Sequence, residues 1–161
     1  PGGWAACDFH LHSIPSPDSE VTLEDRVTAL AAEGIDFAVP TDHDTVTDLR
    51  PAIEKHLRRL ATRELPGRVT LFAQQHQLSF QRVSVRNQRS RWGSCSRRGT
   101  ISLNWRLIQT PVAVQDYIIL HELMHLRQMN HSARFWHEVN SVCPDYLIAE
   151  RWLKQHAALL R

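Results

Sequence analysis

The spacing of apolar and polar residues predicts a strand-helix-strand unit at the start of the chain. Residues 4–11 (WAACDFHL) and 35–40 (IDFAVP) have the apolar character of short buried strands. Between them, residues 22–34 carry apolar side chains at helical spacing, with Thr22 placed to cap the helix and Gly34 placed to end it. One such β-α-β unit cannot bury both faces of its sheet alone.

The middle of the chain changes from a helical to an alternating pattern. Residues 49–77 have apolar positions at helical spacing, and we expect a break near Pro66–Gly67. Residues 78–87 (LSFQRVSVRN) and 100–107 (TISLNWRL) alternate apolar and polar side chains, as half-buried strands do. We expect these two strands to pair antiparallel across the turn-rich loop 88–99.

The last third of the chain is predicted to be helical. Pro111 suits the first turn of a helix over residues 112–129, and Asn130 can end that helix in a left-handed conformation. Residues 133–143 and 146–160 continue as two further helices. The whole pattern predicts an α+β fold, in which strands and helices form separate blocks.

Charge divides the chain in the same place as the pattern. Residues 1–50 hold two basic against ten acidic residues, a net charge of −8, whereas residues 51–161 hold seventeen against seven, a net charge of +10. Such asymmetry predicts two domains: an acidic β-α-β fragment over 1–50 and an α+β domain over 51–161, with the seam between about Asp44 and Lys55.

The cysteine content and the lengths of the apolar runs bear on where the protein is located. Three widely spaced cysteines with no CxxC pair predict a reducing, cytoplasmic location without a disulfide framework. No apolar run reaches the roughly 18 residues that a membrane span needs, so we expect no membrane partner.

The segment HELMHLRQMNH carries the most specific chemistry. Residues four apart lie on one face of a helix, so His121 and His125 can present two imidazoles to one ion. Glu122 follows the first of them, where its carboxylate can reach a water molecule on the ion without binding the ion itself. This is the HExxH pattern of zinc hydrolases, with two ligands and a general base.

The third ligand is expected from residues beyond the helix. His131 lies ten residues after His121, the interval that separates the first and third ligands of the metzincin pattern HExxHxxGxxH. Gln128 occupies the glycine position of that pattern, so the chain must turn differently here. We favour His131, and Glu138 and Glu150 are the alternatives.

The competing interpretation is a helix whose histidines are ordinary hydrogen-bonded groups. The helix is otherwise apolar from Tyr117 to Leu126, and burying His121, Glu122 and His125 together without compensation would be costly. A metal ion would supply that compensation. We therefore expect one Zn²⁺ and hydrolysis by a metal-activated water, with Glu122 as the general base.

Longer stretches of this half resemble a known family. The segments RWGSCS, ISLNW, the HExxH helix and HSARFW, within about residues 52–160, closely resemble the YgjP-like zinc metallopeptidases, relatives of the SprT and WLM groups. The resemblance implies a minimal zincin fold, zinc ligands at the three histidines named above, and a peptide or protein substrate.

Two of these segments predict contacts with substrate. RWGSCS would form a loop near the cleft, which makes Arg91 and Trp92 candidate substrate-binding residues; a purely structural turn packed by Trp92 is the alternative. ISLNW, which contains the candidate Asn104, would form the strand beside the active site, with a free edge to pair with an extended peptide.

An arginine-rich region raises the question of a nucleic-acid partner. A solvated cationic face is the default interpretation, and an acidic substrate or a nucleic acid is the alternative. The SprT and WLM groups act on DNA-bound proteins, which supports the alternative by analogy only. The arginines of this region are Arg82, Arg86, Arg89, Arg91, Arg97 and Arg98.

The acidic head resembles a different family. DFHLHS, with His10 and His12, and TDHD, with Asp42 and His43, look like the first two motifs of the PHP (polymerase and histidinol phosphatase) metal-dependent phosphoesterases. In that family these positions help to bind a metal cluster, and alternate residues of a strand do project to one side. The further β-α units of a PHP barrel are missing, so we expect a remnant that binds a second metal weakly if at all.

Three functions follow, in order of preference. The first is a zinc metallopeptidase. The second is a metal-dependent phosphoesterase or nucleotide hydrolase that uses the head or the same zinc site. The third is a non-catalytic module that binds DNA or protein through its arginines.

Overall fold

A computed structural model describes residues 6–11, 13, 19–35, 37–41, 48–158 and 160. The chain divides into two compact units, Pro1–His56 and Leu57–Arg161. The division falls inside one helix, α2 (Arg50–Gln75). The assignment of separate domains to the two sides of residue 50 stays a prediction.

The first unit contains the predicted β-α-β arrangement. Strands β1 (Cys7–Leu11) and β2 (Phe37–Pro40) pair in parallel, and helix α1 (Leu23–Glu33) connects them. The Thr22 side chain accepts a backbone hydrogen bond of 3.0 Å at the start of α1. Gly34 ends the helix with a left-handed φ of 69°, which glycine adopts without steric cost.

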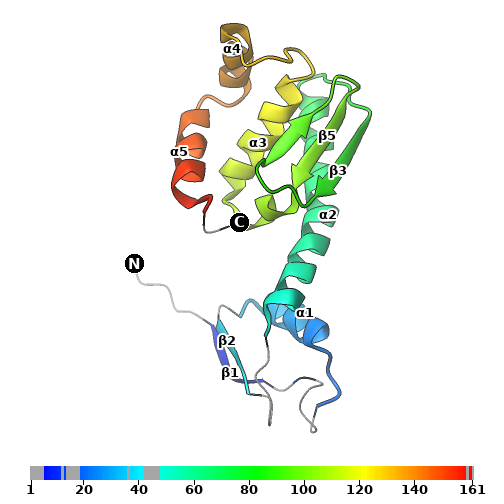
Figure 1. Cartoon of the computed structure of the whole chain (residues 1–161), viewed down its shortest axis with the longest axis vertical. Coiled ribbons are helices and arrows are strands. Elements are labelled where there is room, and N and C mark those ends of the chain that lie inside the picture. The colour runs from blue at the N-terminus through cyan, green and yellow to red at the C-terminus, as the bar shows by residue number, and fades with distance from the viewer. Residues whose placement is uncertain are drawn as a thin grey trace. The chain divides into compact units, whose positions relative to one another are not determined.

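The second unit combines a small sheet with helices, and the predicted α+β class is confirmed. Helix α3 lies between the sheet and α5 (Figure 1). The elements that follow α2 are β3 (Arg82–Arg86), β4 (Gly93–Cys95), β5 (Thr100–Asn104), the 3₁₀ helix η1 (Trp105–Gln109), α3 (Val112–Met124), α4 (Ala133–Val142) and α5 (Tyr146–His156).

The strand pairing differs from the prediction. β5 is the central strand and has β3 parallel to it on one side and β4 antiparallel on the other. The antiparallel pairing that we expected between β3 and β5 is wrong, because β4 forms the hairpin with β5 through a turn that ends at Gly99, whose φ is 78°. The expectation that the ISLNW strand has a free edge is wrong for the same reason. The free edges belong to β3 and β4.

Helix α2 continues through Pro66, so the predicted break near Pro66–Gly67 is wrong. Proline removes one backbone hydrogen bond from a helix and normally kinks or ends it. Here Leu65 and Val69, on either side of Pro66, are both completely buried. Burial of two large apolar side chains stabilises by several kcal/mol, roughly enough to offset that cost.

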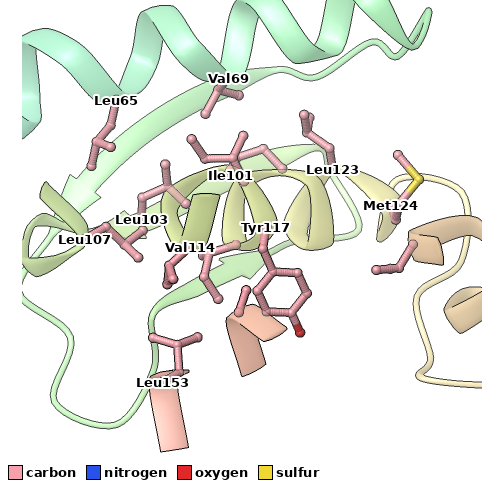
Figure 2. Packing of buried hydrophobic residues seen from close by; sticks show 14 of the residues in the cluster. Leu65, Val69, Ile101, Leu103, Leu107, Val114, Tyr117, Leu123, Met124 and Leu153 are labelled. Atoms are coloured by element: carbon pink, nitrogen blue, oxygen red, sulfur yellow. The ribbon is translucent and has the colours of Figure 1, made fainter. Parts of the chain in front are cut away.

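The core surrounds α3 on two sides. Figure 2 shows α2 and β5 contributing side chains to one side of α3 and α5 contributing to the other. A helix packed from both sides is held at a fixed depth and rotation, which positions the chemistry on its last turn. The core residues that Figure 2 labels include Leu65, Val69, Ile101, Leu103, Val114, Tyr117, Leu123 and Leu153.

Helix α3 is shorter than predicted. It ends at Met124, and the following residues form tighter turns, with the Leu126 amide donating to the Leu123 carbonyl at 3.0 Å. Asn130 was expected to be left-handed, but Gln77 is the non-glycine residue with positive φ in the described segments. The chain thus reverses after α3 without a left-handed residue.

None of the helices that the structure describes is long and apolar enough to cross a bilayer. The cytoplasmic location stays a prediction from the cysteine content.

Candidate metal centre

Three histidines meet where α3 ends and the chain turns back toward α4. His121 lies in the last turn of α3, His125 caps its C-terminus, and His131 follows in the turn. One ring nitrogen from each lies within 4.8 Å of the others, and the Nε2 atoms of His121 and His131 are 3.0 Å apart. The structure thus brings together the three residues that the sequence proposed as ligands.

Hydrogen bonds on the far side of two rings orient them. His125 Nδ1 lies 3.0 Å from the Gln128 carbonyl oxygen, to which it can only donate. His121 Nδ1 lies 3.5 Å from the Tyr117 hydroxyl, and that hydroxyl donates to Glu150 Oε1 at 3.2 Å. Both arrangements favour the proton on Nδ1, which leaves Nε2 as the lone-pair nitrogen. Such partners fix the tautomer and the orientation of metal-binding histidines.

Burial favours the neutral form of two of the three imidazoles. It lowers the pKa of His121 to about 3, with the neighbouring His125 and His131 adding to the effect. Burial also lowers the pKa of His125, although the bond to Gln128 acts in the opposite direction. A lowered pKa means that the ring loses its proton below neutral pH, and only a neutral imidazole can bind a metal.

Aromatic side chains of α4 hold the rings in place. The Phe135 ring is completely buried and stacks on His125 at 4.4 Å between centroids. Trp136 stacks on the exposed His131 at 5.8 Å with an angle of 27° between the planes. Ser132 starts α4 by accepting a bond from the Phe135 amide at 3.4 Å. The cap fixes the start of α4 and with it the positions of Phe135 and Trp136, the aromatic rings on which the imidazoles stack.

Glu122 shares a pocket of about 480 Å³ with the three histidines. Its side chain is only 6% exposed, and burial raises its pKa to about 8, against a weaker opposing effect of the Arg91 charge. Glu122 does not belong to the three-histidine group. The structure therefore places beside the histidines a buried carboxyl group whose pKa is raised above its ordinary range.

The rest of the pocket wall comes from β4 and two flanking residues. Gly93, Ser94 and Cys95 form β4, with Arg91 before it and Met129 after α3. Of these, only Arg91 was a candidate from the sequence. β4 is three residues long and made of small side chains, so its composition is that of a turn and gives no strand pattern. The RWGSCS motif, noted as a loop near the cleft, was the signal that could have located it.

Asn104 and Trp92 are not among the residues that line the pocket; they contact the residues behind its wall. Asn104 is 4% exposed, and its Nδ2 donates to the carbonyl oxygens of Gln88 at 2.7 Å and Arg91 at 3.0 Å. The Trp92 carbonyl accepts the Asn104 amide at 2.8 Å, and the Trp92 ring packs against the core. Asn104 thus holds the loop that delivers Arg91 to the pocket.

The two alternative third ligands have other contacts. Glu138 accepts a bond of 2.8 Å from Arg127 Nη1, and Glu150 accepts the Tyr117 hydroxyl. In the acidic head, the backbone of His10 lies in β1, and its side chain is outside the described part of the structure. His12, Asp42 and His43 lie outside the described residues, so the second metal site stays a prediction.

Comparison with solved structures places this fold among small metallopeptidases. The chain is similar to the metallopeptidase zymogen abylysin of Pyrococcus abyssi, with 23% identity and a TM-score of 0.50 over 56% of this chain and 93% of that one. It is also similar to the zymogen jannalysin of Methanocaldococcus jannaschii, with 22% identity and a TM-score of 0.49 over 60% and 97%. A comparison with curated proteins found no match.

The family follows from the sequence itself. Residues 19–156 match the YgjP-like metallopeptidase domain. The chain therefore belongs to the YgjP-like metallopeptidase family, as its motifs predicted. The match begins at residue 19, well before residue 52, where we expected it to start. It thus includes α1 and β2, which the sequence had assigned to a PHP-like fragment, and the PHP resemblance has no further support.

Proposed function

We propose that this chain hydrolyses peptide bonds at the pocket beside α3, with one zinc ion held by His121, His125 and His131. The observation that carries the proposal is the meeting of three imidazoles and a buried carboxyl group at one pocket. Membership of a metallopeptidase family supports a divalent ion and a peptide substrate. Three neutral imidazole nitrogens suit Zn²⁺ well, and the donor set therefore fits the ion.

Glu122 is the proposed general base. When bound, the ion supplies positive charge that lowers the pKa of a coordinated water toward roughly 7 and polarises the substrate carbonyl. Glu122 takes the proton of the attacking water and passes it to the leaving amine. Burial supports this role, because a carboxyl group with a raised pKa can both accept and release a proton near neutral pH.

Strand β4 is the proposed docking edge for the peptide. It pairs with β5 on one side only, and all three of its residues line the pocket. The open backbone groups of an edge strand can bond an extended peptide. Arg91, exposed on the same wall, would attract a carboxylate of the substrate.

Two other functions stay predictions. The six arginines between residues 82 and 98 are all exposed, which is compatible with nucleic-acid binding and equally with a solvated face. The phosphoesterase hypothesis depends on residues of the head that lie outside the described segments.

The test is the loss of activity without the loss of metal. Glu122→Gln keeps the shape of the side chain but cannot accept the proton, so we expect zinc content to stay unchanged and hydrolysis of denatured fluorescent casein to fall about 10²- to 10⁴-fold. Glu138→Gln makes the same chemical change outside the pocket and should keep full activity. Casein hydrolysis unaffected by Glu122→Gln would rule out the mechanism, and activity lost instead on His10→Ala would assign it to the head.

A further inference from the structure

Gly93, the first residue of β4, packs directly against the side chain of Glu122. A Cβ atom placed on Gly93 would lie 2.6 Å from Glu122 Cγ, 2.7 Å from Oε1 and 2.9 Å from Cδ. Real Cβ atoms essentially never approach other heavy atoms that closely. The space that any other residue would fill at position 93 is therefore occupied by the carboxyl arm of Glu122.

The backbone does not account for the glycine. The glycines with positive φ in the described part of the chain are Gly34 and Gly99. Gly93 instead has a strand conformation, paired antiparallel with Leu103, that any L-residue can adopt. Glycine within a strand otherwise marks a site where another group comes close, and here that group is Glu122.

Glu122 could not avoid a larger residue by a small adjustment. If only Oε1 were in contact, rotation of the carboxylate would relieve it. The nearest atom is Cγ, whose position depends on χ1, and a helical residue has only two common χ1 rotamers. A side chain at position 93 would thus move the whole carboxyl arm.

We propose that Gly93 is a positioning residue, whose missing side chain provides the slot that holds the Glu122 carboxylate at the histidine pocket. The inference rests on the proposed function for its catalytic consequence only. It also gives the glycine of the RWGSCS motif a reason: the missing side chain leaves room for Glu122, while Asn104 holds the preceding loop through the Arg91 carbonyl.

The first arm of the test measures turnover of the zinc-loaded full chain with Gly93→Ala. We expect kcat on casein peptides to fall about 100-fold, as displacement of a catalytic group by about 1 Å does. KM and zinc stoichiometry should change little, because the ligands and the substrate edge remain. Gly67→Ala is the matched control, since a Cβ there meets nothing within 4 Å, and it should keep wild-type kcat. Unchanged kcat in Gly93→Ala would overturn the proposal.

The second arm measures stability and does not depend on activity. Gly93→Ala should lower the urea midpoint of the wild-type chain but hardly that of Glu122→Ala, in which the Cγ and carboxylate are gone. Folding of Gly93→Ala only in the Glu122→Ala background would support the contact equally. The same loss, or failure to fold, in both backgrounds would overturn it. If Glu122→Gln stays active, the proposed function fails while this stability comparison still decides whether the slot exists.

Discussion

Two of the three histidines are oriented by hydrogen bonds and ring contacts from within the protein. His125 is held between the Gln128 carbonyl and the Phe135 ring, and His121 is oriented by Tyr117, which in turn is bonded to Glu150. Preoriented ligands lose little freedom when an ion binds. The spacing of the three histidines predicted that they would meet, whereas the sequence offered Glu150 only as an alternative ligand and gave no sign of its hydrogen bond with Tyr117.

Tyr117→Phe tests this row. The substitution keeps the ring and its packing but removes the oxygen that faces His121 Nδ1, so we expect zinc affinity to fall about 10- to 100-fold with one ion still bound. Competition with a chromophoric chelator measures the affinity. Tyr146→Phe removes a hydroxyl from the neighbouring ring of the same stack and should leave the affinity unchanged. Equal affinities in both variants would show that the Tyr117 hydroxyl does not support the ligand.

At the scale of elements, the sequence predicted those that have a strong apolar periodicity and missed those that are short or depend on tertiary packing. The apolar runs of α3, α4 and α5 identified three helices, although α3 ends earlier than its pattern. β4 was missed because three small residues carry no alternation. The β3–β5 pairing was given the wrong direction because the pattern of a strand does not encode its partner. A helix break was predicted at Pro66 from the local effect of proline alone, whereas burial of Leu65 and Val69 keeps the helix continuous.

The contribution of α2 to the core can be measured within one helix. Leu65→Ala removes a completely buried side chain and should lower the free energy of unfolding by about 2–5 kcal/mol. Leu71 lies on the same helix, six residues further on, but is 60% exposed, so Leu71→Ala should change the free energy of unfolding by less than about 0.5 kcal/mol. Urea titration followed by circular dichroism gives both values. Similar losses in the two variants would contradict the packing in Figure 2.

At the scale of the molecule, an ion at the centre would link α3 to the turn that leads into α4. A ligand that binds only the folded chain stabilises it, by about 2.7 kcal/mol at a free concentration of 100 times Kd. We therefore expect chelation of zinc to lower Tm and re-addition to restore it. The zinc-dependent part of Tm should be retained in Glu122→Gln and largely lost in His131→Ala. A Tm that is the same with and without zinc would exclude a tightly held ion.

The two edge strands of the small sheet, β3 and β4, differ in charge. An unpaired strand is a template on which another chain can add: this would serve the proposed peptide substrate, but it is hazardous if copies of the protein join one another. β3, the border away from the pocket, begins and ends with the exposed cations Arg82 and Arg86. These cations would repel the same residues of a second molecule and so disfavour pairing along β3, whereas β4 carries no charged side chain and leaves its border open to the proposed substrate.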